Sequence, residues 1–193
     1  MNLINKLTMV LSKVFEVVHW IGAGVMALFA LFSVIDKTGF GETVKELVLE
    51  DGNLLVYGLD INPLTATGEV NTIAVTLFCV AGIIAMILMA MLFRNVNLIF
   101  KTVNGKNKKA TSTSPFQKDI IRMIKEIGYF SIAIPVVGFI FSVIITAVSL
   151  ISGVGGTEIA LNFDSFILGI ICLSLSNIFT YGANLEKDVD GLL

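Results

Sequence analysis

The chain has 193 residues, of which 55% are hydrophobic and 15% charged, and its mean hydropathy is +0.90. A soluble domain averages roughly 45–50% apolar and about 25% charged residues, so this composition is not that of an ordinary soluble domain. The formal net charge of −2 argues against direct contact with nucleic acid, because such proteins carry basic surfaces that neutralise phosphates.

The hydrophobic excess lies in four blocks, each near the roughly 20 apolar residues that cross a bilayer as a helix. Backbone groups in lipid must be paired within the segment, so each block is predicted to be a helix. We therefore expect an all-α integral membrane protein, a single domain over residues 1–193 that forms a bundle of four transmembrane helices. The predicted spans are residues 17–35, 73–93, 129–151 and 161–181.

Lysine and arginine are distributed unevenly among the segments between these spans. The N-terminal tail, the loop 94–128 and the C-terminal tail together carry eleven basic residues, whereas the loop 36–72 carries Lys37 and Lys45 against seven acids. Basic residues in short loops accumulate on the cytoplasmic side of a membrane. We therefore expect a multi-pass membrane protein with both termini and the basic loop in the cytoplasm.

In the outer loop, Asp51-Gly52 separates two apolar runs, residues 46–50 and 53–57. Asp-Gly between such runs is a strong hairpin signal, because a type I′ turn needs positive φ at both central residues. The sequence therefore predicts a small extracytoplasmic β-hairpin that turns at this pair. An irregular loop and a short amphipathic helix over residues 42–49 are the alternatives.

The basic inner loop begins with residues 95–103, which are predicted to continue the second helix beyond the bilayer. Ser114-Pro115-Phe116-Gln117 then predicts a helix start, with serine as N-cap, proline at the first helical position and glutamine placed to close a capping box. Two interpretations of the loop stay open. One is contact with anionic lipid headgroups, to which each basic residue contributes about 1 kcal/mol. The other is a docking surface for a cytoplasmic protein.

Polar groups within the spans are costly in lipid and are the first candidates for function. Glu16 and His19 lie one helical turn apart, and with Asn177, near the cytoplasmic end of the fourth span, they form a candidate intramembrane polar cluster. Di-iron bundles need Glu-x-x-His twice, whereas this chain has it once, and Cys79 and Cys172 have no zinc spacing. We expect no metal and no cofactor.

Two segments resemble a known family. The residues that carry the resemblance are Ser114-Pro115-Phe116-Gln117, Arg122 and Ile127-Gly128, which resemble a cytoplasmic P-F…R…I-G signature, and Phe179, Gly182 and Leu185, which resemble an F-x-x-G-x-x-L ending. The family is the bacterial group of small membrane proteins catalogued as domain of unknown function 2975. The resemblance covers most of the chain, although the ending Asp188-Val189-Asp190-Gly191 departs from the family tail.

The resemblance implies four spans with a longer first outer loop, and it carries over no catalytic residue, since the family has no assigned activity. Its members are often encoded beside a small Cro-type helix-turn-helix regulator, which implies a cytoplasmic regulatory partner. The segments that carry the resemblance define a candidate partner face, which comprises Phe116, Arg122, Phe179, Gly182 and Leu185.

The sequence shows no nucleophile–base pair, phosphate-binding loop or metal motif, which favours a protein that is not an enzyme. We expect a membrane protein of regulatory or sensory type whose cytoplasmic face contacts a regulator. Two alternatives stay open. One is an immunity or envelope-protection protein that binds a peptide or lipid within the bilayer, for which an apolar groove is typical. The other is a small-solute transporter, for which a polar cavity is typical.

Overall fold

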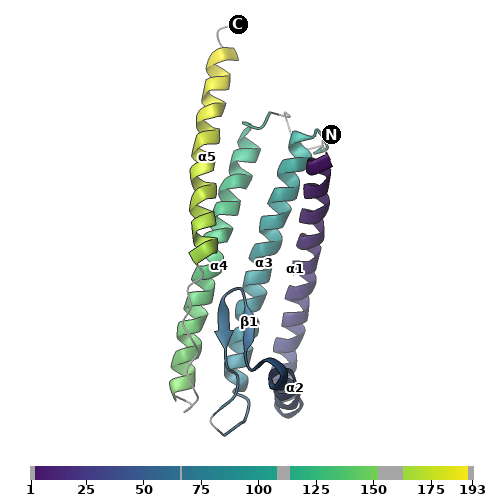
Figure 1. The fold of residues 1–193 in the computed structure, drawn as a ribbon, viewed down its shortest axis with the longest axis vertical. Coiled ribbons are helices and arrows are strands. Elements are labelled where there is room, and N and C mark those ends of the chain that lie inside the picture. The colour runs from purple at the N-terminus through teal and green to yellow at the C-terminus, as the bar shows by residue number, and fades with distance from the viewer. Residues whose placement is uncertain (1–2, 66, 108–113, 152–162, 191–193) are drawn as a thin grey trace. The chain divides into compact units, whose positions relative to one another are not determined.

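The computed structural model describes residues 3–65, 67–107, 114–151 and 163–190. Within these residues there are five α-helices and one antiparallel pair of strands (Figure 1). The elements are α1 (Leu3–Ile35), α2 (Lys37–Asp51), β1 (Leu54–Val56), β2 (Leu59–Ile61), α3 (Thr72–Val103), α4 (Lys118–Ile151) and α5 (Phe163–Asp190).

Four of these helices, α1, α3, α4 and α5, are long and apolar enough to cross a membrane, which confirms the four predicted apolar helices. Each extends beyond its predicted span. The 33 residues of α1 rise about 50 Å at 1.5 Å per residue, more than the roughly 30 Å of a bilayer's hydrocarbon core. The helices are therefore longer than the apolar segments predicted within them, and the predicted continuation of the second helix to Val103 is confirmed.

The chain forms two compact units, each of which contains parts of several helices. The first unit comprises Met1–His19, Leu88–Ala133 and Asp164–Leu193, and the second comprises Trp20–Ile87 and Ile134–Phe163. The helices α1, α3 and α4 each contribute residues to both units.

In the first unit, a buried amide joins the start of α1 to the end of α3. The Asn97 side chain is 4% exposed, and its Nδ2 donates to the Met9 carbonyl oxygen at 2.6 Å. Further along α1, Phe15 stacks on Phe93 with ring centroids 5.0 Å apart. A buried amide that is left unpaired costs about 1–3 kcal/mol, so the bond from Asn97 fixes the register of the two helices.

Also in the first unit, α4 crosses α5 where both helices have a glycine. A Cβ atom built on Gly128 would lie 3.0 Å from the Gly169 carbonyl oxygen, and one built on Gly169 would lie 2.8 Å from the Gly128 carbonyl oxygen. Small residues permit this close approach between helices in a membrane. On the other side of α4, Asn95 of α3 donates to Glu126 at 2.8 Å.

The core of the second unit forms beneath α2. Phe40, Val44 and Val48 recur every four residues on one face of this helix and are at most 2% exposed. Phe40 packs edge-on against Phe29 and Phe32 of α1, with ring centroids 5.8 Å apart in each pair. This apolar stripe holds α2 against α1 and the neighbouring elements, because residues four apart share one helical face.

The predicted hairpin is present, but its strands and turn are not those expected from Asp51-Gly52. Residues 46–50 belong to α2, so the alternative of an amphipathic helix is confirmed there, over a longer range. Gly52 ends α2 with a φ of 76°, and its N–H donates to the Val48 carbonyl oxygen at 2.7 Å. The same positive φ that suits a hairpin turn also suits the residue that follows a helix, and the apolar stripe of α2 decides between them.

The observed hairpin turns at Tyr57-Gly58, whose φ angles are 45° and 84°. Val56 pairs with Leu59, and Leu54 pairs with Ile61. Positive φ at both central residues is the type I′ arrangement that a two-residue hairpin favours. Burial also raises the pKa of the Tyr57 phenol above its ordinary value.

The helix start predicted at Ser114 is wrong by one turn. Ser114 Oγ accepts from the Phe116 N–H at 3.2 Å and donates to Glu186 of α5 at 3.0 Å. The first helical carbonyl is that of Gln117, which accepts from Ile121 at 3.2 Å, and α4 begins at Lys118. Ser114-Pro115-Phe116 is thus a turn that precedes the helix. Its serine side chain donates a hydrogen bond to α5 and does not cap α4.

Gly52, which caps the C-terminus of α2, and Gly41, which lies inside that helix, make a matched test of the cap. Gly52→Ala should lower the free energy of unfolding by about 1–2 kcal/mol, because a Cβ is disfavoured at positive φ. Gly41→Ala, inside the same helix with nothing within 4 Å of its Cβ position, should instead raise it by about 0.5–1 kcal/mol. Thermal or denaturant unfolding of the purified protein in detergent measures both, and equal effects would contradict the cap.

Candidate functional site

The turn before α4 places Phe116 against α5. Its ring lies 5.5 Å from that of Phe179, and a Cβ built on Gly182 would lie 2.6 Å from a Phe116 ring carbon. Three residues of the candidate partner face, which are far apart in the sequence, are therefore in contact. Glycine at position 182 leaves the space that the ring occupies.

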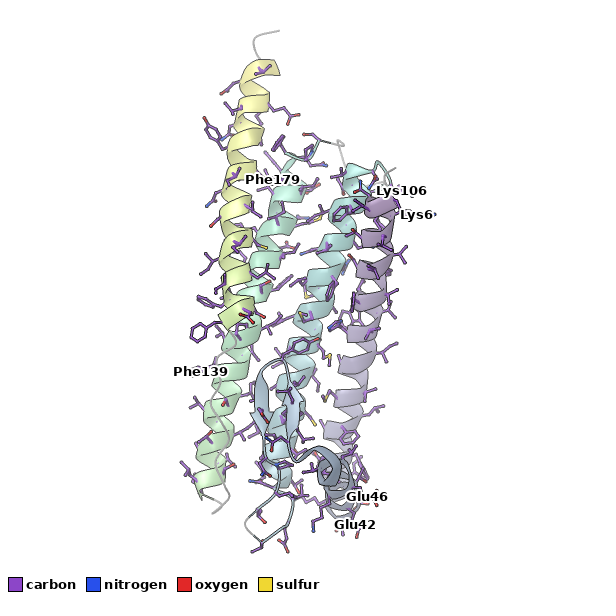
Figure 2. The ribbon with its side chains drawn as sticks, in the orientation of Figure 1. Lys6, Glu42, Glu46, Lys106, Phe139 and Phe179 are labelled. Atoms are coloured by element: carbon purple, nitrogen blue, oxygen red, sulfur yellow. The ribbon has the colours of Figure 1, made fainter. Side chains whose placement is uncertain are left out.

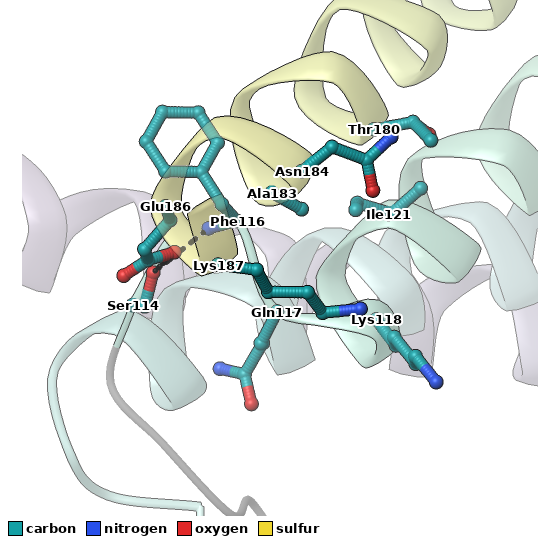
Figure 3. Close-up of a pocket in the computed structure, with 10 residues that line it drawn as sticks. All are labelled: Ser114, Phe116, Gln117, Lys118, Ile121, Thr180, Ala183, Asn184, Glu186 and Lys187. Carbon is teal, nitrogen blue, oxygen red and sulfur yellow. Dashed lines mark hydrogen bonds between the residues drawn. The ribbon is translucent and has the colours of Figure 1, made fainter. Parts of the chain in front are cut away.

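Beside this contact, α4 and α5 enclose a cleft of about 340 Å³ in the first unit (Figure 3). Residues from the turn and the first helical turn of α4 form one wall, and residues from the last part of α5 form the other. The cleft is lined by Ser114, Phe116, Gln117, Lys118, Ile121, Thr180, Ala183, Asn184, Glu186 and Lys187. Its volume is in the lower range of pockets that bind small molecules, and it can accept one or two side chains of a partner.

The cleft combines an apolar wall with charged groups at its edge. Phe116, Ile121 and Ala183 supply apolar surface, while Lys118 and Lys187 line the cleft from the two helices. Both lysine side chains are exposed. Glu186 accepts the hydrogen bond from Ser114 Oγ at 3.0 Å, which connects the turn to α5 (Figure 3). The arrangement suits an occupant with an apolar anchor and a negative charge.

Of the five residues of the candidate partner face, Phe116 alone lines the cleft, and Arg122 and Leu185 lie apart from its contact with Phe179 and Gly182. Arg122 is 65% exposed and lies 3.8 Å from Asp119 and 3.6 Å from Glu126 on its own helix. Glu126 in turn accepts from Asn95 of α3, so the guanidinium is on a different face of α4 from Ile121. Leu185 is 47% exposed on α5. Three of the five residues, Phe116, Phe179 and Gly182, therefore pack together. The other two, Arg122 and Leu185, are exposed.

The candidate polar cluster is brought together only in part. Glu16 and His19 are both buried on α1, where Lys13 pairs with Glu16 at 3.0 Å. His19 Nδ1 donates to the Phe15 carbonyl oxygen at 2.6 Å, and its ring lies 5.3 Å from that of Phe93. Asn177 is exposed on α5. The first two side chains thus have local partners on α1, which favours a role in packing.

The part of the chain that the structure describes contains few side chains that could bind a metal ion or react as thiols. No cluster of three histidine, cysteine, aspartate or glutamate residues that could hold a metal ion occurs there. Cys79 and Cys172 are free thiols; Cys79 is buried and Cys172 is half-buried. Neither is joined to the cleft between α4 and α5, whose lining contains no cysteine.

Sequence reasoning missed most of the α5 wall. It placed the end of the fourth span near residue 181, whereas α5 continues to Asp190. A signal was available, because Thr180, Ala183, Asn184 and Lys187 recur at intervals of three and four and share one helical face.

Comparison with known proteins finds no matching family model, no matching curated protein and no matching solved structure.

Proposed function

We propose that this protein is a multi-pass protein of a bacterial inner membrane, with both termini in the cytoplasm. The distribution of charge supports this orientation. Eleven of the thirteen basic residues belong to the first unit, and Lys37 and Lys45 of the second unit are the remaining two. In Figure 2, Lys6 lies near the start of α1 and Lys106 beyond the end of α3, whereas Glu42 and Glu46 lie on α2, which follows the other end of α1. Lysine and arginine residues in short loops remain on the cytoplasmic side of the membrane, so the basic residues of the first unit are expected there.

Cysteine labelling tests this orientation. In a background without Cys79 and Cys172, a cysteine at Asn53 should react in intact cells with a membrane-impermeant maleimide, and one at Lys106 should react only after the cells are opened. Both positions are exposed, so the structure itself does not prevent the reaction. The reverse pattern would overturn the orientation.

We further propose a regulatory or sensory protein that is not an enzyme and whose cytoplasmic face binds a protein partner. The cleft between α4 and α5 is the observation that carries this proposal, because it joins the Phe116 contact to two exposed lysines. Interfaces concentrate their binding energy in a few central residues surrounded by polar neighbours. A partner segment with one apolar anchor and acidic flanks fits this arrangement.

The identity of the partner rests on the resemblance to the family catalogued as domain of unknown function 2975, and membership of that family is itself part of the proposal. The family context implies a small helix-turn-helix regulator, so we propose that such a regulator binds the cleft and is held at the membrane. The protein would then act on transcription through its partner, without touching nucleic acid.

Gentle extraction of the tagged protein from its host tests the partner. A regulator should be recovered with the wild type and identified by mass spectrometry. Phe116→Ala should reduce its recovery, because the ring forms the wall of the cleft and packs on Phe179. Docking at the cleft would be refuted if no cytoplasmic protein were recovered with the wild type. It would also be refuted if the wild type and Phe116→Ala recovered the same protein in equal amount.

A second candidate function has its own support. The second unit contains an apolar cavity of about 200 Å³ whose lining side chains are all apolar. Such a cavity is typical of the alternative class, an envelope-protection protein that binds a lipid or peptide in the bilayer. The two functions use different units of the chain, and a sensor could combine them.

A further inference from the structure

The apolar cavity of the second unit lies among α1, α2, β1 and α3. Met26 and Phe29 of α1 and Val75 and Phe78 of α3 form much of its wall, and its volume is about 200 Å³. All nine lining residues are apolar. Water in a cavity needs two to four polar partners, and an apolar cavity of about 150 Å³ in another protein stays dry and binds benzene. The occupant of this cavity must therefore be apolar.

The mouth of the cavity is formed by exposed apolar side chains. Val25 of α1 and Leu47 of α2 both line it and are each 53% exposed. Ile21 and Leu28, one turn to either side of Val25, are 62% and 68% exposed. Since α1 is long and apolar enough to cross a membrane, this surface faces hydrocarbon when the helix spans the bilayer.

The depth of the cavity follows from α2. This helix turns Phe40, Val44 and Val48 inward, while Glu42 and Glu46 are exposed. Charged side chains are costly in hydrocarbon, so the exposed face of α2 lies in the headgroup layer while its other face covers the core. The cavity is on the apolar side of α2, because Val44 and Leu47 line it. It therefore opens at the level of the acyl chains of the leaflet nearest α2.

We propose that this cavity binds the end of one acyl chain of a phospholipid from the outer leaflet. A chain that moves there from the bilayer gains no hydrophobic energy, because the bilayer is already apolar. It gains dispersion contacts with walls that an empty cavity leaves without partner atoms. A single chain also enters while its headgroup stays at the surface. The inference rests on the proposed membrane location, and not on the cytoplasmic partner.

Photochemical labelling tests the proposal with the full chain in vesicles of phosphatidylethanolamine and phosphatidylglycerol. A phospholipid that carries a diazirine in one acyl chain should label the cavity side chains Met26 and Phe78 above Leu31, a 59% exposed residue on α1 outside the cavity. A phospholipid with the diazirine in its headgroup should not label Met26 or Phe78. Equal labelling of Leu31 by the acyl-chain probe would overturn the proposal.

Substitutions at the mouth of the cavity test whether the labelled chain enters there. Val25→Phe should reduce labelling of Met26 and Phe78 by about five-fold or more, because the ring fills the mouth. Val18→Phe is the control: Val18 is 54% exposed on the same helix, two turns from Val25, and does not line the cavity, so labelling should change by less than about two-fold. Leu47→Phe closes the mouth from α2 and serves if Val25→Phe does not fold.

The same diazirine on a free fatty acid distinguishes the source of the chain. At equal chain concentration, the phospholipid should label the cavity at least as strongly as the fatty acid. Labelling by the fatty acid alone would overturn the phospholipid as the ligand. Unchanged labelling in folded Val25→Phe and Leu47→Phe variants would overturn the cavity as the site, while reversed cysteine labelling at Asn53 and Lys106 would instead refute the orientation.

Discussion

Gly169→Ala should destabilise the protein by about 1–3 kcal/mol, the usual cost of adding a group to a well-packed contact. A Cβ at this position would lie 2.8 Å from the Gly128 carbonyl oxygen and 2.5 Å from Ile132 Cγ1. The first of these atoms belongs to the backbone, so no side-chain rotation can relieve the clash. The helices α4 and α5 would have to separate in the first unit, with loss of packing along their crossing. Unfolding by a denaturing detergent, followed by circular dichroism, measures the effect.

Gly24→Ala is the matched control, because Gly24 is in the apolar part of α1 and its Cβ position has no atom within 4 Å. In an exposed position within a helix, alanine is favoured over glycine by roughly 0.5–1 kcal/mol, so this variant should be as stable as the wild type or slightly more stable. A loss of stability equal to that of Gly169→Ala would show that α4 and α5 do not cross at the two glycines.

The four apolar helices could be predicted from sequence because lipid imposes a strong constraint on length and composition. The ends of the helices could be predicted only in part: the continuation of the second helix to Val103 was expected, whereas α5 continues to Asp190, past the predicted end at Tyr181. In the outer loop the local signal of Asp51-Gly52 was ambiguous between a hairpin turn and a helix end. The spacing of Phe40, Val44 and Val48 decided it, and that pattern was visible in the sequence.

The candidate site was predictable only as separate segments. Phe116, Phe179 and Gly182 were selected together from their resemblance to family motifs, and the structure brings the three into contact. The cleft itself depends on the crossing of α4 and α5, which positions Lys118 opposite Lys187 in its lining. The helical spacing of the α5 residues shows that they share a face, but not which face of α4 that face meets, so the tertiary contact itself lay beyond sequence reasoning.

The double charge reversal Lys118→Glu with Lys187→Glu should reduce recovery of the cytoplasmic partner by about ten-fold or more, a change in binding free energy of about 1.4 kcal/mol or more. Both lysines line the cleft, so the reversal turns attraction for an acidic segment into repulsion. Arg122→Ala should have a smaller effect, because Asp119 and Glu126 already neutralise part of the charge of Arg122. Partner recovery is measured relative to the amount of protein inserted in the membrane.

The control Lys101→Glu with Lys125→Glu makes the same change in net charge outside the cleft, on α3 and α4. Attraction to anionic headgroups depends on the number of basic residues and is nearly additive, so it predicts equal effects for the two double variants. A specific docking site depends on which residues change, so it predicts that the control retains the partner within about two-fold. Equal loss in both would show that the basic residues serve only membrane contact and topology.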